Sequence, residues 1–263
     1  MNDDKFSAIE EDIDLSPKKI ERLEKTLEDL KVEEEVFDKY TLMTLYELSR
    51  RGYLDGLMGF VKTGKEANVA RGVRGDDLVA VKIYRVATSD FRRMWRYLRG
   101  DHRVKVRGRR RHRIVYTWAE REFKNLLAAH RAGIRSPEPY AHMNNVIVME
   151  FLGDDEGNPY PLLKYHPPED PETAEEVLWN ILDDYHRLYT EGGIVHGDLS
   201  EYNILYAGDG EYYIIDFSQG VPTDHPMAEE LLVRDVSNLL RFFARQGTDV
   251  PGVEEAVSHV KGG

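Results

Sequence analysis

The sequence predicts an α+β protein with two lobes, a mostly β half followed by a mostly α half. Short runs with a period of about two residues gather at 59–84, and longer runs with helical spacing dominate from residue 172 onward. Between them, 153–171 is rich in Gly, Pro and acidic residues, which is typical of a connector. The expected organisation is an acidic helical extension at 1–52, a first lobe at 53–152, a connector at 153–171 and a second lobe at 172–263.

The N-terminal extension is predicted to contain two helices. Ser16 and Pro17 suit the N-cap and first position of a helix. Apolar residues at helical spacing follow them (Ile20, Leu23, Leu27 and Leu30). A second helix is expected at 41–50, before Gly52.

The first lobe is predicted to contain five strands and one long helix. The strands are expected at 59–62, 68–73, 78–84, 138–143 and 146–151. Turn-forming residues separate neighbouring runs, for example Asn144 and Asn145. The helix is expected at 116–132, ending at Gly133. The second lobe is expected to hold helices at 172–190, 227–245 and 253–260.

Composition narrows the class of protein. With 263 residues and 41% hydrophobic residues, the chain can bury a sizeable core. It has no cysteine, which excludes disulfides and Cys-ligated zinc. No apolar run approaches the ~20 residues of a membrane span, and the N-terminus lacks the basic start and apolar stretch of a signal peptide. We therefore expect a soluble, cytoplasmic protein.

The net charge of −12 is unevenly distributed. Residues 92–113 carry eleven Arg or Lys and one acid, so this basic segment is +10 and the rest of the chain is −22. Residues 1–38 hold fourteen acids and six bases. The basic segment lies in an expected flexible insert at 86–114. It is compatible with a solvated face or with a surface that binds nucleic-acid phosphates.

The most specific chemical signal is His196-Gly-Asp198-Leu-Ser-Glu-Tyr-Asn203, followed by Ile-Ile-Asp216-Phe217 on the next predicted strand. Asp198 can orient the proton of an attacking hydroxyl or water. Asn203 and Asp216 offer the hard oxygen ligands that Mg²⁺ prefers. Either piece alone could be an ordinary turn. Both in this order favour Mg²⁺-dependent phosphoryl transfer, with Asp198 and Asp216 as catalytic candidates.

A lysine interrupts the apolar strand at 79–83. Burying Lys82 is costly unless an anion pairs with it, and nucleotide phosphates together with a helical Glu would supply that partner. Glu120 and Glu122 point to different faces of the helix, and Glu122 is favoured because Leu126 shares its face. The alternative is an edge-strand lysine whose amine reaches solvent.

Two further segments are candidates for nucleotide binding. The turn Thr63-Gly64-Lys65 lies one strand before Lys82 and could bring backbone N–H groups close to phosphates, although the three-glycine pattern is absent. Backbone groups of Glu150 and Leu152, where a strand enters the connector, could bind adenine.

Three smaller expectations concern single side chains. Asp235 is a candidate acceptor of backbone hydrogen bonds from the catalytic loop, with a surface charge as the alternative. His196 is expected to pack beside Phe217 rather than transfer protons. Thr88 and Ser89 are candidates for autophosphorylation or for helix capping.

Taken together, these motifs resemble the RIO family of atypical serine protein kinases, Rio-one branch. The signatures are Thr-Gly-Lys-Glu-Ala-Asn-Val at 63–69, Val-Ala-Val-Lys at 79–82, His-Gly-Asp-Leu-Ser-Glu-Tyr-Asn at 196–203 and Ile-Asp-Phe-Ser-Gln at 215–219. The resemblance implies a two-lobed kinase-like fold with ATP and Mg²⁺ or Mn²⁺ as cofactors. In it, Lys82 would contact the phosphates, Asp198 would be catalytic, and Asn203 and Asp216 would bind the metal.

The resemblance also implies what such an enzyme does. Family members phosphorylate serine, autophosphorylate and act as ATPases in maturation of the small ribosomal subunit, and an aspartyl-phosphate would fall on Asp216. The basic segment would then contact pre-rRNA of the assembling subunit. The protein substrate is not identified by the sequence.

The sequence departs from ordinary protein kinases. Ser200 stands where they have Lys, and only 47 residues follow Asp216, without Ala-Pro-Glu. We therefore expect a trimmed C-lobe that lacks the activation segment and the substrate-binding helices.

Two other functions remain as alternatives. A small-molecule phosphotransferase of the aminoglycoside or choline kinase type also uses His-Gly-Asp, but usually carries His-Pro where Ser200 and Glu201 lie. A nucleotide-gated ribosome-assembly scaffold would bind ATP without needing efficient turnover.

Overall fold

The computed structural model describes residues 37–105 and 110–263, and the chain forms two compact units. The first comprises Met1–Leu98, Arg103–Phe123 and Pro139–Phe151, and the second comprises Arg99–His102, Lys124–Glu138 and Leu152–Gly263. The helix expected after Ser16 lies outside the described residues.

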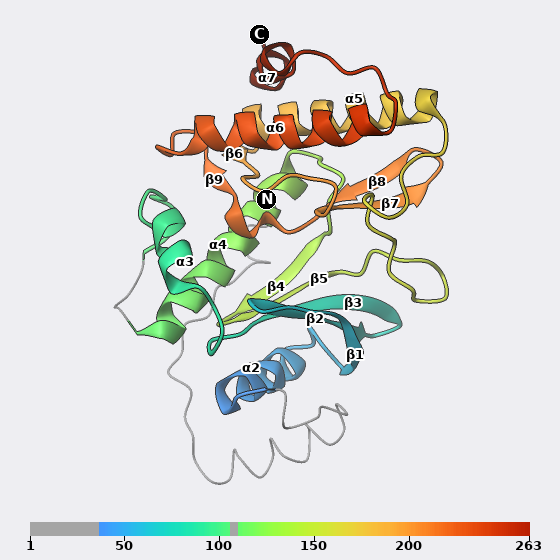
Figure 1. The fold of residues 1–263 in the computed structure, drawn as a ribbon. Helices are drawn as coiled ribbons and strands as arrows, with labels where there is room; N and C mark the ends of the chain where they lie inside the picture. Colours follow the sequence, from blue (N-terminus) through green and yellow to red (C-terminus); the bar gives the residue numbers. More distant parts are fainter. Residues whose placement is uncertain (1–36, 106–109) are drawn as a thin grey trace, which may run out of the picture. The chain divides into compact units, whose positions relative to one another are not determined.

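The first unit is built on a five-stranded antiparallel sheet of order β1-β2-β3-β5-β4 (Figure 1). The strands are β1 (Gly56–Thr63), β2 (Ala67–Arg74), β3 (Asp77–Tyr84), β4 (Pro139–Met143) and β5 (Val146–Glu150). In β3, all residues from Val79 to Tyr84 are buried, because the strand lies in the middle of the sheet with both faces covered. The edge-strand alternative for Lys82 is therefore wrong: its register places it between Val69 of β2 and Ile147 of β5.

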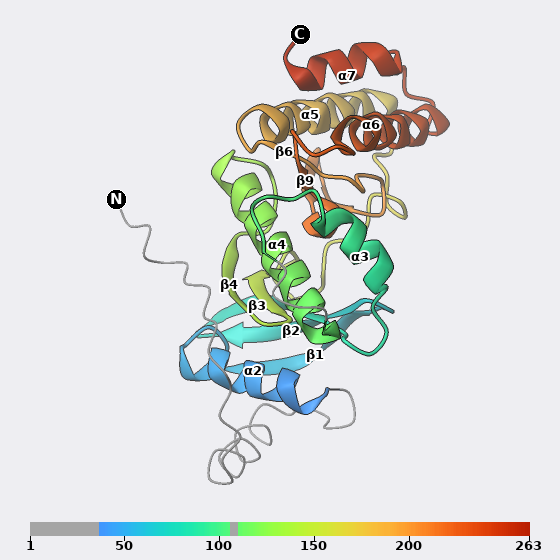
Figure 2. The ribbon, with the colours of Figure 1, turned by 90° about the vertical axis from the view of Figure 1, so that its left-hand side faces the viewer.

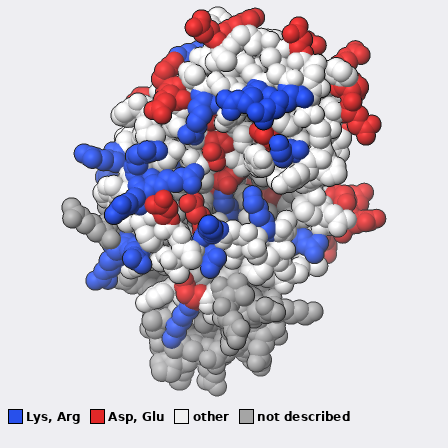
Figure 3. Space-filling model, in the orientation of Figure 1, with Lys and Arg blue, Asp and Glu red and all other residues white. Residues whose placement is uncertain are grey.

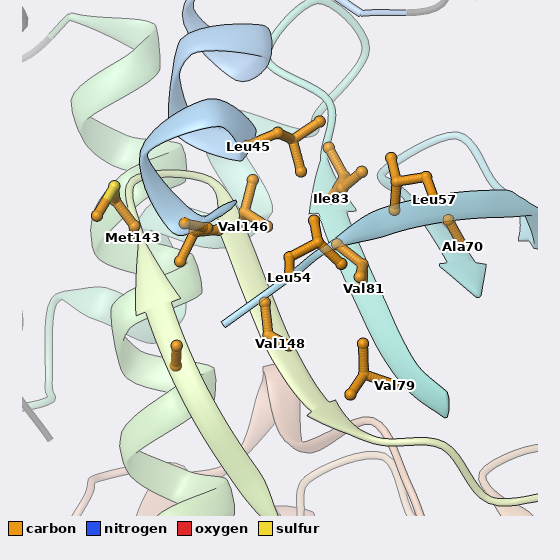
Figure 4. Close-up of a cluster of buried hydrophobic side chains, with 12 residues drawn as sticks. Leu45, Leu54, Leu57, Ala70, Val79, Val81, Ile83, Met143, Val146 and Val148 are labelled. Atoms are coloured by element: carbon orange, nitrogen blue, oxygen red, sulfur yellow. The ribbon is translucent and has the colours of Figure 1, made fainter. Parts of the chain in front are cut away.

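Helix α2 (Lys39–Arg50) covers one face of this sheet. It begins at Asp38, whose carboxylate accepts the Thr41 N–H at 2.9 Å. The apolar side of α2 and the strands form one buried cluster (Figure 4), which includes Leu45, Leu48, Leu54, Val81, Ile83, Val146 and Val148. Burying these side chains is the main driving force that holds the sheet and helix together.

Helix α4 (Arg111–Arg131) is shared between the two units, and its first part, up to Phe123, covers the other face of the sheet (Figure 2). The Phe123 ring stacks on His142 of β4 at a centroid distance of 5.8 Å. The face that carries Glu122 is thereby directed at the central strand.

The insert expected at 86–114 contains a helix that the sequence did not predict, α3 (Phe91–Leu98). Its apolar positions Met94, Tyr97 and Leu98 are buried, and the Tyr97 ring packs edge-on against Trp118 of α4 at 5.9 Å. Asp90 caps it by accepting the Arg93 N–H at 3.1 Å. The capping role considered for Thr88 and Ser89 is therefore wrong.

The second unit packs three helices, α5 (Pro171–Thr190), α6 (Ala228–Arg245) and α7 (Val253–Lys261), against one another (Figure 2). Asp170 caps α5 through the Thr173 N–H at 2.8 Å, and Pro171 occupies its first turn. None of the helices in the described part of the chain is both long and apolar enough to cross a membrane.

Two small strand pairs carry the catalytic motifs in this unit. The first joins β6 (Ile194–Val195) to β9 (Val221–Pro222), and the second joins β7 (Ile204–Gly208) to β8 (Glu211–Ile214). Asp216 was expected on a strand, but β8 ends at Ile214. Asp216 instead has a left-handed backbone, with φ of 62°, and leads into a short 3₁₀ turn at Phe217–Gln219.

Candidate active site

In the first unit, Lys82 forms a buried ion pair with Glu122. The Lys82 Nζ lies 2.6 Å from Glu122 Oε1, and both side chains are less than a tenth exposed. The Tyr84 hydroxyl donates to the other carboxylate oxygen of Glu122. The partner is thus Glu122, the helical glutamate that the sequence favoured. A buried pair of this kind adds little stability by itself, because desolvating both charges is costly. Its presence in a central strand makes Lys82 a candidate functional cation, held in a fixed position.

The turn between β1 and β2 is fastened to the start of the insert. The Gly64 carbonyl accepts a hydrogen bond from the Arg85 guanidinium at 3.3 Å, and the Glu66 carbonyl accepts the Arg85 N–H at 2.8 Å. Between them, the Lys65 carbonyl accepts the Thr88 hydroxyl. An ion pair of 3.5 Å joins the Glu66 carboxylate to Arg93 of α3. Three consecutive carbonyls are therefore engaged, which fixes the turn expected to cover phosphates. Thr63 ends β1 opposite Asn68.

In the second unit, Asp235 of α6 binds the backbone of the candidate catalytic loop, residues 196–203. Its carboxylate accepts the N–H groups of Gly197 at 2.7 Å and Leu199 at 3.1 Å, and the Tyr185 hydroxyl at 2.7 Å. This confirms the expected role and excludes the surface-charge alternative, since Asp235 is fully buried. Burial raises the pKa of Asp235 to about 7, although its hydrogen bonds act in the opposite direction.

Two other contacts fix the loop that begins at His196. The imidazole packs on Phe217 at a centroid distance of 4.9 Å, and its Nε2 lies 3.1 Å from the Ile215 carbonyl, so the expected structural packing is confirmed. Gly197 has φ of 76°, and a Cβ there would lie 2.6 Å from the Gln219 carbonyl oxygen. Only glycine fits this approach of two backbone segments.

Asp198, Asn203 and Asp216 come from segments that are hydrogen-bonded to one another. The Asn203 amide nitrogen donates to the Asp198 carbonyl at 2.8 Å and to its carboxylate at 3.3 Å. The Asn203 carbonyl accepts the Ile215 N–H at 2.9 Å, next to Asp216. Because the amide nitrogen is committed to Asp198, the side-chain oxygen is the atom that Asn203 presents to a ligand. That oxygen and the Asp216 carboxylate are donors of the type that suits Mg²⁺.

Sequence reasoning missed Asn125, which positions the segment after Asp216. This fully buried side chain of α4 donates from Nδ2 to the carbonyls of Phe217 and Gly220, both at 2.9 Å. Both contacts lie within the second unit. The available signal was a polar residue between Phe123 and Leu126 on a helix face otherwise expected to be apolar.

The two residues expected to bind adenine flank the end of β5. Glu150 is the last residue of β5 and pairs with Val79. The Leu152 carbonyl accepts the Tyr160 N–H at 3.1 Å. Leu152 is thus anchored in the second unit, whereas Glu150 belongs to the first.

Comparison with known proteins agrees with this arrangement. The family model of the RIO domain matches residues 67–256. The chain is 45% identical over 231 residues to RIO-type serine/threonine-protein kinase Rio1 of Haloferax volcanii, covering 87% of this chain and 77% of the relative. It is 38% identical over 232 residues to human serine/threonine-protein kinase RIO1, covering 86% of this chain and 40% of that protein.

Solved structures of RIO kinases are also similar to this chain. The chain matches the Rio2 kinase–ADP/Mg²⁺–phosphoaspartate complex from Chaetomium thermophilum with a TM-score of 0.62 and 25% identity, covering 85% of this chain and 67% of that one. The expected α+β kinase-like fold is therefore confirmed. The chain belongs to the RIO domain family, whose matching relatives are RIO-type serine/threonine-protein kinases.

Proposed function

We propose that this protein is an ATP- and Mg²⁺-dependent serine/threonine protein kinase of the RIO type, with ATPase activity and autophosphorylation. The observation that carries the proposal is the geometry of the catalytic loop. Asp198 and Asn203 are hydrogen-bonded to each other, and the loop backbone on both sides of Asp198 is hydrogen-bonded to the buried Asp235 carboxylate. This arrangement fixes a carboxylate and an amide oxygen before any substrate arrives.

Each candidate site residue has a separate role in phosphoryl transfer. Asp198 orients the acceptor hydroxyl and takes its proton as the oxygen attacks the γ-phosphorus, while the bond to the β–γ bridging oxygen breaks and ADP leaves. Lys82, oriented by Glu122, holds the phosphates. Bound through Asn203 and Asp216, Mg²⁺ (or Mn²⁺) would neutralise charge on the phosphate oxygens.

Hydrolysis of ATP can use the same residues in two steps, with water as the final acceptor. The Rio2 structure is described as a phosphoaspartate complex with ADP and Mg²⁺. By likeness to it, we assign Asp216 as the aspartate that would accept the γ-phosphoryl group, with water releasing inorganic phosphate afterwards.

The assignment of Asp198 is tested by Asp198→Asn. We expect the variant to bind ATP with unchanged affinity in calorimetry, and to lose at least a hundredfold in ATP hydrolysis and autophosphorylation. Asp209→Asn, in the exposed turn between β7 and β8, is the matched control and should retain wild-type activity. Full activity in Asp198→Asn would overturn the catalytic assignment, whereas ATP binding without turnover by the wild type would favour the nucleotide-gated scaffold.

We also propose that the basic segment binds rRNA during maturation of the small ribosomal subunit. Lys and Arg side chains gather over α3 (Figure 3), and those of Arg92, Arg93, Arg96 and Arg99 are exposed. Arginine is well suited to bind phosphates, and each phosphate contact makes binding more salt-dependent.

The rRNA proposal is tested with Arg92→Gln/Arg99→Gln. Binding to transcribed small-subunit rRNA should weaken severalfold, with a shallower dependence on salt and unchanged ATP affinity. Arg241→Gln/Arg245→Gln, two exposed arginines of α6, remove the same charge and serve as the control. Equal RNA binding by both double variants would contradict a role for this segment.

The small-molecule phosphotransferase is the second candidate. Membership of the RIO family weighs against it. Phosphorylation of amino-sugars or choline at rates above that of protein serine would reinstate it.

A further inference from the structure

A short segment that follows the connector runs beside the catalytic loop, within the second unit. The Leu163 N–H donates to the Ile204 carbonyl at 2.9 Å, and the Lys164 N–H donates to the Glu201 carbonyl at 3.1 Å. The backbone at Lys164 is therefore fixed against the loop that carries Asp198 and Asn203.

This segment and the catalytic loop beside it each expose a tyrosine side chain to solvent. Tyr165 is 68% exposed and Tyr202, within the catalytic loop, is 47% exposed. The Lys164 amine lies 5.5 Å from the centre of the Tyr202 ring. The N–H groups of Tyr165 and His166 both donate to the Leu162 carbonyl, at 2.9 and 3.2 Å, so the turn that displays them is rigid.

Exposed tyrosines on a fixed backbone are suited to binding. A tyrosine offers a large contact area at a small cost in side-chain entropy, and tyrosine is enriched among residues that dominate protein interfaces. A rigid backbone lowers the entropic cost of binding further, because it loses little conformational freedom when a partner binds. We call Lys164, Tyr165, His166 and Tyr202 the tyrosine surface.

We propose that the tyrosine surface docks the polypeptide that carries the acceptor serine or threonine, through an apolar or aromatic side chain near the acceptor. This rests on the proposed protein kinase function. Tyr202 immediately precedes Asn203, so a segment bound on its ring reaches the same loop as Asp198.

The charge of the surface favours polypeptide over RNA. The Lys164 amine lies 3.8 Å from the Glu201 carboxylate, and the exposed acids Glu169 and Asp170 follow along the chain. A phosphate backbone requires uncompensated positive charge. Here one lysine lies among three carboxylates, so the surface lacks the excess positive charge that RNA needs and suits a polypeptide.

The test compares Tyr165→Ala and Tyr165→Phe with Tyr40→Ala, a control that removes a tyrosine ring 56% exposed on α2. With dephosphorylated casein as acceptor, Tyr165→Ala should raise KM for casein about tenfold. KM for ATP and the rate of ATP hydrolysis without casein should not change. Tyr165→Phe, which keeps the ring, should stay within about threefold of wild type. In a serine-centred peptide library, Tyr165→Ala should lose a preference for apolar residues that wild type and Tyr40→Ala show.

Each other outcome is decisive. An unchanged KM for casein together with an unchanged library preference in Tyr165→Ala would refute the docking role while leaving the kinase function intact. Wild-type protein that hydrolyses no ATP and phosphorylates nothing would instead refute the proposed function, and the docking role with it. Loss of rRNA binding in Tyr165→Ala, with casein phosphorylation unaffected, would assign the surface to RNA and overturn the proposal.

Discussion

The ammonium group of Lys82 lies 2.6 Å from the Glu122 carboxylate in the interior of the first unit. Glu122→Leu takes the carboxylate partner away from this buried cation, so it should destabilise the unit by about 3–5 kcal/mol. Hydrogen exchange of the β3 amides measures this local stability.

The double variant Lys82→Met/Glu122→Leu is the control for that measurement. It replaces both charges by apolar groups and should recover most of the lost stability, while remaining inactive in phosphoryl transfer. A double variant as unstable as Glu122→Leu would mean that packing, rather than charge, causes the loss.

Stability should depend on pH through Asp235. Its pKa rises from the ordinary value of 3.8 to about 7 on burial, so the folded protein holds this proton more tightly than the unfolded chain does. The stabilisation is complete below about pH 4 and is lost as the pH rises to about 7. Between these limits, wild type should lose about 1.4 kcal/mol per pH unit relative to Asp235→Asn. Urea unfolding of both proteins from pH 4 to 8 tests this, and parallel curves would contradict it.

Gly197→Ala should damage the catalytic loop. The substitution adds the strain of a left-handed alanine, roughly 1 kcal/mol, and drives Cβ to 2.6 Å from the Gln219 carbonyl. Because Gly197 adjoins Asp198, we expect phosphoryl transfer to fall at least tenfold. Gly210→Ala has a similar φ of 80° but nothing within 4 Å of its Cβ. Kinetic assays should therefore show little effect there, and equal losses in both variants would assign the defect to strain alone.

The turn at 63–66 should depend on Thr88. Thr88→Val removes the hydroxyl that donates to the Lys65 carbonyl, a bond whose net contribution is about 1 kcal/mol. If the turn covers the nucleotide, ATP affinity should fall about fivefold in calorimetry, and amide exchange across the turn should accelerate. Thr88→Ser keeps the donor and should behave as wild type. Faster exchange without weaker ATP binding would separate the turn from the nucleotide.

The sequence predicted the elements whose signal is local. Short β-prone runs bounded by turn residues located β2 and β3. The lysine inside the apolar run of β3 marked Lys82, and helical spacing selected Glu122 over Glu120. For Asp235 the sequence left two alternatives, an acceptor of backbone hydrogen bonds and a surface charge, and its bonds to the Gly197 and Leu199 N–H groups decide between them.

What the sequence did not predict depends on tertiary contact. In α3, three of eight positions are arginine, which hides the buried stripe of Met94, Tyr97 and Leu98 that only the packing on Trp118 explains. The start of α4 was placed five residues late for the same reason, since basic residues precede its apolar face. Asn125 bonds with residues more than ninety positions away, and no local pattern encodes that separation.

The short path from Asp216 to β9 has a consequence for control. The chain rejoins β6 at Val221, and Asn125 holds the carbonyls on the way. A segment that rearranges when it is modified, for example by phosphorylation, needs free chain length. The stretch between Asp216 and Val221 is too short and too firmly held to supply it. For the proposed kinase, we therefore expect no activation by modification of the stretch between Asp216 and Val221.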